Sequence, residues 1–224
     1  FGNTTGAGNV AVGNTAMYVN TTGTRNIAIG MNAYNSSDTE NDNLAIGYDA
    51  MTTDTAGGQY NVAIGNYALD ALTSGDNNVA LGYGALTDNT TGGKNTATGT
   101  SALGNNTTGG ENVAVGALSL FTNTTASYNT AVGTSALTDN TTGASNTGVG
   151  RMALYENTTG SNNTSVGMNS MLDNTTGASN TAIGESALGN NTTADNNTAV
   201  GKGSLGTNTT GADNVAVGFT ALTA

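Results

Sequence analysis

Short apolar segments recur along the chain at a nearly constant interval, and each of them ends at a glycine. The spacing of these glycines is constant, as from Gly13 to Gly30, and only the step from Gly47 to Gly65 is longer by one residue. The repeated unit reads N-x-A-V-G-x-x-A-L-x-x-N-T-T-G-x-x and occurs thirteen times. A chain that keeps this phase is predicted to be folded, because disorder requires no fixed period. The aligned glycines are Gly13, Gly30, Gly47, Gly65, Gly82, Gly99, Gly116, Gly133, Gly150, Gly167, Gly184, Gly201 and Gly218.

Each repeat contains segments typical of strands and turns. The string N-V-A-V-G is too short for a helix and indicates a strand of four or five residues, with a second short extended stretch at A-L. The N-T-T-G segment has turn chemistry, because asparagine and glycine accept unusual backbone angles. Two strands and two turns per repeat predict an all-β fold, a parallel β-solenoid of about thirteen 17-residue coils. We expect residues 1–224 to form a single repeat array, irregular around residues 36–60.

An asparagine stands four residues before every aligned glycine. We call the residues at one position of the repeat a rank, because in a solenoid each of them stacks on its equivalent in the next coil. Stacked asparagines pass amide hydrogen bonds from layer to layer in cross-β assemblies, so this rank is predicted to form a structural ladder. Its members are Asn9, Asn26, Asn43, Asn61, Asn78, Asn95, Asn112, Asn129, Asn146, Asn163, Asn180, Asn197 and Asn214.

Two apolar ranks and one alanine rank flank the aligned glycine. We expect the aliphatic rank that contains Val12 and Ile29, together with the Leu/Met rank that contains Leu69, to fill a narrow interior. The alanine rank then points to the opposite strand face. Either it packs against another chain, or it lines a tight corner of the coil. The candidate chain-packing residues are Ala11, Ala28, Ala45, Ala63, Ala80, Ala97, Ala114, Ala131, Ala182, Ala199 and Ala216.

The composition argues against several functional classes. The sequence has no His or Cys, so histidine-assisted nucleophiles, cysteine nucleophiles and zinc clusters cannot be built, and no enzyme is expected. A net charge of −11 with only four basic residues argues against a nucleic-acid partner and against an anionic membrane surface. No apolar run approaches the length of a membrane-spanning helix.

The few charged residues follow the same period. Three carboxylates, Asp139, Glu156 and Asp173, share one rank on successive coils. Carboxylates about 5 Å apart repel one another, so a cation such as calcium is one candidate there. The alternative is that they extend into solvent, and no other cofactor is expected. Oppositely charged residues also lie one repeat apart, which predicts ion pairs between adjacent coils: Arg25 with Asp42, Lys94 with Glu111, and Glu185 with Lys202.

Two further segments carry alternative interpretations. The acidic segment Ser36–Asp42 is either a local cation site or a tolerated loop, and it lies near the extra residue around Gly57 and Gly58. The N-T-T triplets at Asn89, Asn106 and Asn123 match the N-glycosylation acceptor pattern, but they are equally explained as the repeated turn.

The repeat resembles known families. The core "NVAIGNYAL" at Asn61–Leu69 resembles the head repeats of trimeric autotransporter adhesins. The fuller unit "NTAVGTSALTDNTTGAS" at Asn129–Ser145 is similar to repeats of bacterial and phage tail-fibre-domain proteins. The resemblance implies a left-handed parallel β-roll, three chains packed side by side through the alanine rank, and display on a cell or virion surface.

The expected function is structural: the shaft of an extracellular fibre, filament or adhesin. The expected partner is the chain itself, in a trimer or in a head-to-tail filament, with a surface receptor or a glycan as a further candidate. The chain begins and ends inside a repeat, which suggests either a piece of a longer array or coils that continue across subunit junctions. The alternative is a ligand-binding solenoid, with threonine ranks at Thr90/Thr107/Thr124/Thr141 and Thr91/Thr108/Thr125/Thr142 as an ice-binding face.

Overall fold

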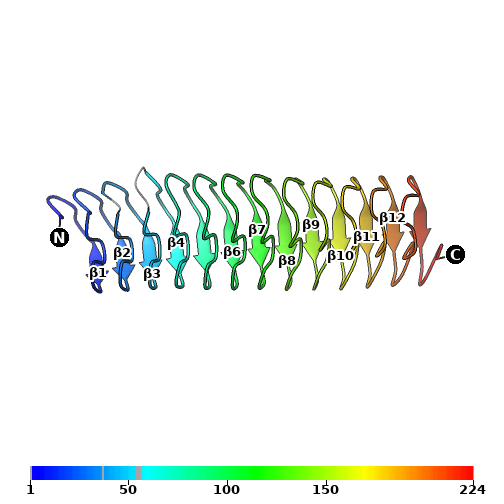
Figure 1. Ribbon diagram of the computed structural model, residues 1–224, viewed down its shortest axis with the longest axis horizontal. Coiled ribbons are helices and arrows are strands. Elements are labelled where there is room, and N and C mark those ends of the chain that lie inside the picture. Colours follow the sequence, from blue (N-terminus) through cyan, green and yellow to red (C-terminus); the bar gives the residue numbers. More distant parts are fainter. Residues whose placement is uncertain (1, 37, 54–56, 224) are drawn as a thin grey trace. The chain divides into compact units, whose positions relative to one another are not determined.

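The computed structural model describes residues 2–36, 38–53 and 57–223, and within them every regular element is a short β-strand. Ser37 and residues 54–56, which belong to the segment expected to be irregular, lie outside the described residues. The chain divides into two compact units, Phe1–Glu111 (unit 1) and Asn112–Ala224 (unit 2). Both units are built from the same coil, with one three-residue strand in each repeat (Figure 1).

Unit 1 is a parallel β-solenoid. Its strands pair in chain order with a register of one repeat, so that Ala11 lies opposite Ala28. Between β3 and β4 the register is longer by one residue, and Ala45 lies opposite Ala63. The extra residue is therefore accommodated between two strands without disturbing their pairing. The strands are β1 (Val10–Val12), β2 (Ile27–Ile29), β3 (Leu44–Ile46), β4 (Val62–Ile64), β5 (Val79–Leu81) and β6 (Thr96–Thr98).

Unit 2 repeats this architecture. Its strands again pair parallel and in chain order, with a constant register of one repeat, as where Ala182 lies opposite Ala199. The fold predicted from the period, a parallel β-solenoid with one repeat per coil, is therefore confirmed in each unit. The strands are β7 (Val113–Val115), β8 (Thr130–Val132), β9 (Thr147–Val149), β10 (Thr164–Val166), β11 (Thr181–Ile183), β12 (Thr198–Val200) and β13 (Val215–Val217).

The second extended stretch predicted at A-L is wrong. In Leu69 and Leu86 of this segment φ is +51° and +53°, which is the left-handed helical region and not the extended one. The residue two positions earlier is also left-handed, as at Tyr67 with φ of +61°. Such angles are uncommon outside glycine, so the segment forms a tight corner that turns the Leu/Met side chain inward.

The interior of each coil is narrow, and the alanine rank faces it. The side chains of Ala28, Ala45 and Ala131 are fully buried, and so are those of Leu69 and Leu137 from the Leu/Met rank. At Gly148, which occupies the alanine position, an added Cβ would lie 3.3 Å from Leu137 Cδ1. The alanine rank thus packs on the Leu/Met rank, and only a small side chain fits between them.

The short distance between coils allows only glycine at the aligned position. In Gly65 φ is +143°, and an added Cβ would lie 2.3 Å from the carbonyl oxygen of Gly82 in the next coil. In unit 2 the same Cβ at Gly184 would lie 2.6 Å from the carbonyl carbon of Gly201. Any side chain would therefore force the coils apart, and the backbone angle itself disfavours one.

Candidate functional site: the ladders, the outer sheet face and the turns

The asparagine rank before each strand forms hydrogen bonds from coil to coil. Asn9 Oδ1 accepts a bond of 2.9 Å from the backbone N–H of Asn26 in the next coil. Asn146 Oδ1 accepts the equivalent bond of 3.0 Å from Asn163 N–H in unit 2. Each amide Nδ2 also donates to a carbonyl of its own coil, as from Asn146 to Gly160 O at 2.8 Å. One side chain thus joins two coils and closes the turn of its own coil.

A second asparagine ladder runs through the N-T-T-G turns and was not predicted. Asn157 Nδ2 donates to Asn140 Oδ1 at 2.8 Å and to Gly160 O at 3.0 Å. The signal is present in the sequence, because this asparagine recurs in every repeat from Asn89 to Asn208, but turn chemistry alone is enough to explain it there. The residues of the ladder in unit 2 are Asn123, Asn140, Asn157, Asn174, Asn191 and Asn208.

The second ladder also bears on glycosylation. Asn89, Asn106 and Asn123 are fully buried, and the amide of Asn89 donates to Gly92 O at 2.9 Å. A glycan would have to be attached to the nitrogen atom that makes such a bond. The turn interpretation of N-T-T therefore accounts for these residues, and in the folded chain their amides are inaccessible.

The expectation that the alanine rank forms an outer packing face needs correction. A face that packs on another chain is exposed in a single chain, yet the members from Ala28 to Ala199 are fully buried and Ala216 is nearly so. Ala11 alone is half-buried. The aliphatic rank that was expected inside, from Val12 and Ile29 onward, lies on the outer face instead. The physical reason is the width of the coil, which admits alanine opposite leucine but no second branched side chain.

The outer sheet face of unit 1 is apolar over five strands. Val10, Val12, Ile27, Ile29, Val79 and Leu81 are between 37% and 57% exposed. Leu44, Ile46, Val62 and Ile64 are half-buried on the same face. Because the register is fixed, these side chains form two parallel rows of branched or aliphatic residues. In β6 both outward positions change to threonine, at Thr96 and Thr98.

The outer sheet face of unit 2 is amphipathic over strands β8–β12, whereas β7 and β13 carry valine at both outward positions. The first outward position of strands β8–β12 is always threonine and the second is always valine or isoleucine. The threonines are half-buried, and none of their hydroxyl groups has a hydrogen-bond partner among residues 57–223. The row is Thr130, Thr147, Thr164, Thr181 and Thr198, with Val132, Val149, Val166, Ile183 and Val200 beside it.

The threonine ranks of the N-T-T turns differ from this row. In the first rank the hydroxyl groups of Thr90 and Thr141 donate to carbonyl oxygens of the next coil, both at 2.9 Å. Thr107 and Thr124 of the same rank are half-buried. In the second rank Thr91, Thr108, Thr125 and Thr142 are exposed. The hydroxyl groups of the first rank therefore link adjacent coils. The second rank lies on a turn outside the sheet.

The three carboxylates Asp139, Glu156 and Asp173 do lie in one rank, since their backbone N–H groups make equivalent bonds to the next coil. Asp139 and Asp173 are half-buried and Glu156 is exposed. Burial raises the pKa of the Asp139 carboxyl above its usual value. Among residues 2–36, 38–53 and 57–223, no three acidic, histidine or cysteine side chains are grouped so as to hold a metal ion.

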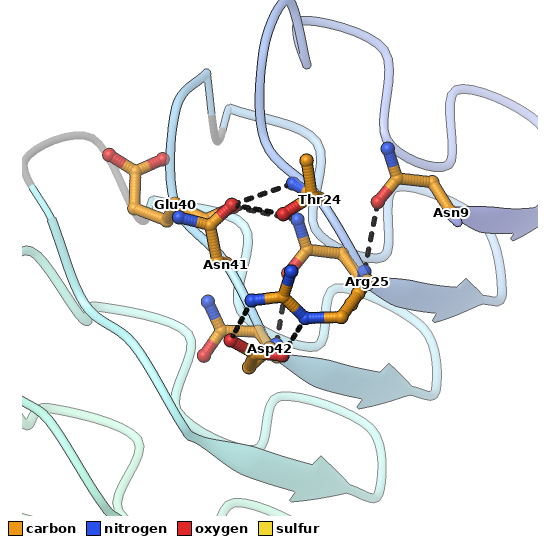
Figure 2. A network of polar contacts seen from close by, with 8 residues as sticks. Asn9, Thr24, Arg25, Glu40, Asn41 and Asp42 are labelled. Carbon is orange, nitrogen blue, oxygen red and sulfur yellow. Dashed lines mark hydrogen bonds and ion pairs between the residues drawn. The ribbon is translucent and has the colours of Figure 1, made fainter. Parts of the chain in front are cut away.

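The predicted ion pairs between coils are confirmed. Arg25 binds Asp42 through two bonds of 2.6 Å (Figure 2), Lys94 lies 3.3 Å from Glu111, and Lys202 lies 3.0 Å from Glu185. The hydrogen bond from Arg25 lowers the pKa of Asp42, and the bond to Asp42 raises the pKa of Arg25. These pairs are largely exposed, so they contribute little to stability, and their value is as evidence of the register.

The acidic segment that ends at the Arg25–Asp42 pair uses its polar groups on its own loop and on the preceding coil. Asn41 Oδ1 accepts from the backbone N–H and the hydroxyl of Thr24, at 2.8 and 2.7 Å (Figure 2). The buried Glu40 carboxylate accepts from the backbone N–H groups of Asp38 and Thr39, both at 3.0 Å. These bonds support the loop interpretation of the segment, of which Ser37 lies outside the described residues.

Unit 1 also carries a tyrosine cluster that was not predicted. Tyr67 packs edge-to-face on Tyr48 and on Tyr83, with ring centroids 5.4 and 5.6 Å apart. The three residues follow β3, β4 and β5 in successive coils. A hydrogen bond with Asp49 raises the pKa of Tyr48. The cluster extends the exposed apolar surface of unit 1 beyond the strands.

Comparisons of the chain with protein-family models, with curated proteins and with solved structures found no match. In the described part of the chain, no helix has the length and apolar character needed to cross a membrane. The surface of the solenoid therefore carries the functional evidence.

Proposed function

We propose that the chain is a structural repeat array of an extracellular fibre, filament or adhesin, whose copies associate side by side through the outer sheet face of unit 1. The observation that supports this is the pair of apolar rows on β1–β5. Soluble monomers rarely expose large contiguous apolar patches, and such patches mark interaction sites. A display site on a cell or virion surface follows only from the resemblance to adhesin and tail-fibre repeats.

The occupant of this face is a second copy of the chain. The rows are regular, with one pair of side chains per coil, and an equivalent face on another copy offers the same spacing. Fully burying a Val, Leu or Ile side chain contributes about 1.5–3 kcal/mol, so a half-exposed one gains about 1 kcal/mol. Ten such side chains give about 10 kcal/mol, which is comparable to the roughly 4–15 kcal/mol that association costs. We therefore expect concentration-dependent association that one charged substitution abolishes.

The rest of the surface supports a structural role. Coils are joined by two asparagine ladders, and the polar groups of the turns bond to the next coil. The chain has no His or Cys for acid–base or thiol chemistry, and we propose no enzymatic activity. A trimer is the expected assembly, because the resemblance to adhesin heads implies three chains. In this proposal the chains pack through the aliphatic ranks of the outer face and not through the alanine rank.

The test is sedimentation-equilibrium ultracentrifugation of the chain over a range of concentrations, with electron microscopy of the same samples. Ile29→Lys places a charge within the face, on β2, and we expect it to leave only monomer. Thr22→Lys is the matched control, because Thr22 is an exposed turn residue in the preceding coil segment. Circular dichroism of both variants verifies that the solenoid is intact.

Discrete trimers or regular filaments of the parent chain, lost in the Ile29 variant and kept in the Thr22 variant, support the proposal. A parent chain that stays monomeric at all concentrations overturns it. Association that survives Ile29→Lys would place the contact on another surface, and it would overturn the proposal that the outer face of unit 1 is the contact. Ile27→Thr sharpens the result, because it gives β2 the Thr-Ala-Ile sequence of β11 in unit 2 and is expected to weaken association without adding charge.

A further inference from the structure

The threonine row of unit 2 differs from the turn threonine ranks, because its hydroxyl groups lie on the sheet face and have no partner in the described residues. The strands hold these residues in register, with Thr130 opposite Thr147 and Thr164 opposite Thr181. The Cβ-branched side chain restricts χ1, so the hydroxyl and methyl groups have few orientations available. The row is therefore a preorganised array of donors, acceptors and methyl groups.

From this array we infer that the outer sheet face of unit 2 binds the surface of ice, a function independent of the self-association proposed for unit 1. Adjacent strands in a sheet are about 4.8 Å apart, and the two outward positions of one strand are about 6.6 Å apart. The face thus presents a two-dimensional lattice of hydroxyl and methyl groups. Water in ice also lies on a fixed lattice, so one face can satisfy many water molecules in the same way.

The rigidity of the coils favours a lattice over a flexible partner. Long sheets with little twist occur where stacking or side-chain ladders hold them. In unit 2 the first ladder joins Asn129, Asn146 and Asn163 by bonds of 2.9 and 3.0 Å, and the second joins the turns of the same coils. Because these bonds have nearly the same length in each coil, they keep the strand spacing nearly constant along the row.

Burial of this face against a dry protein surface is unfavourable. Each hydroxyl left without a partner in a dry interface is unfavourable, and over five threonines this penalty opposes the gain from the neighbouring apolar row. Ice provides a partner for each hydroxyl, because every hydroxyl both donates and accepts. Immobilising a bridging water normally costs entropy, but water in ice is already immobile. Strands β8–β12 also carry no charged residue that would hold liquid water at the face.

The test is uptake of the fluorescently labelled full chain into a slowly growing ice crystal, together with measurement of thermal hysteresis. We expect the parent chain to be enriched in ice over a labelled protein of similar mass. Thr164→Lys interrupts the centre of the row and is expected to reduce uptake at least tenfold. Thr159→Lys is the control, because Thr159 is an exposed turn residue near the same coil, and it should retain uptake.

Thr164→Val removes the hydroxyl and keeps the shape, and we expect an intermediate, several-fold reduction. Valine occupies this position in β7 and β13, so the fold tolerates it. Exclusion of the parent chain from ice overturns the inference, and so does uptake that Thr164→Lys leaves unchanged. The Ile29→Lys variant separates the two proposals: it should lose self-association and keep ice uptake.

Discussion

Units 1 and 2 have the same interior and different outer faces. Inside, Ala45 of unit 1 and Ala131 of unit 2 are equally buried against a Leu/Met rank. Outside, the first outward residue is Val, Ile or Leu in β1–β5 and Thr in β8–β12. The difference shows that the inward positions are determined by the closure of the coil, whereas the outward positions are free to vary. Function is therefore to be sought in the outward ranks.

The largest effect is expected where the two units are identical. Gly184→Ala places a Cβ within 2.6 Å of the Gly201 carbonyl carbon, at a residue with φ of +135°. Overpacking and an unfavourable backbone angle together predict a loss of about 2–4 kcal/mol in the free energy of unfolding. Denaturant unfolding followed by circular dichroism measures it. Gly30→Ala in unit 1 should cost the same, because its Cβ would lie 2.2 Å from Gly47 O.

The control for this substitution lies in the same coil. Gly189→Ala adds the same methyl group further along the coil, where other coils carry Thr138, Tyr155 and Leu172. Its Cβ approaches Ser186 O at 3.2 Å, and a small shift relieves this contact. We expect a change below about 1 kcal/mol. Equal losses at Gly184 and Gly189 would contradict the argument that coil spacing fixes the aligned glycine.

The period predicted most of the fold, and the failures have a common cause. The constant repeat length predicted the strand register, the asparagine rank and the ion pairs, because stacking places equal positions together. Alternation along a strand separates Ala28 from Ile29, but it does not say which of them points inward. General hydrophobicity favours the larger side chain inside, and this expectation failed because a short coil has no room for it. Coil width depends on the corners, whose left-handed residues such as Leu69 have no sequence signature.

The outer threonine row and the second asparagine ladder likewise could not be predicted from the repeat pattern alone. Thr164 and Thr158 are both threonines in regular ranks, and the repeat pattern points first to the turn threonines. Their difference is a hydrogen bond, since Thr158 Oγ1 donates to Thr175 O at 3.0 Å whereas the Thr164 hydroxyl lies on the sheet face. The availability of a hydroxyl depends on the backbone around it, which the repeat pattern does not reveal.

A smaller effect is expected in the asparagine ladders, and it differs between them. Asn146→Leu removes the acceptor for the Asn163 N–H and the donor to Gly160 O. A buried backbone donor without a partner costs about 1–3 kcal/mol, and the lost bonds add to it, so we expect a loss of about 2–3 kcal/mol. Asn61→Leu in unit 1 should cost the same. Thermal and denaturant unfolding provide the measurement.

Asn157→Leu in the second ladder should cost less than Asn146→Leu, because it leaves the side-chain acceptor Asn140 Oδ1 without its donor but no backbone N–H without an acceptor. Asn157 Oδ1 accepts from Asn174 Nδ2, which keeps its other bond to Gly177 O. Gly160 O likewise keeps its bond from Asn146. The exposed Asn190 provides the control for replacing Asn by Leu on the surface. A larger loss at Asn157 than at Asn146 would show that the second ladder dominates coil stacking.

The smallest effect concerns charge, where the units also differ. In unit 1 the Arg25 guanidinium lowers the pKa of Asp42, whereas in unit 2 burial raises the pKa of Asp139. A raised pKa means that the folded chain favours the protonated acid, so the Asp139 carboxylate destabilises the fold at neutral pH. This penalty is absent below the ordinary value of about 3.9, where folded and unfolded chains both hold the proton. Asp139→Asn should therefore raise the melting temperature slightly at pH 7 and leave it unchanged near pH 3. Lower stability of the variant at pH 7, together with stabilisation of the parent alone by added calcium, would instead establish a cation at this rank.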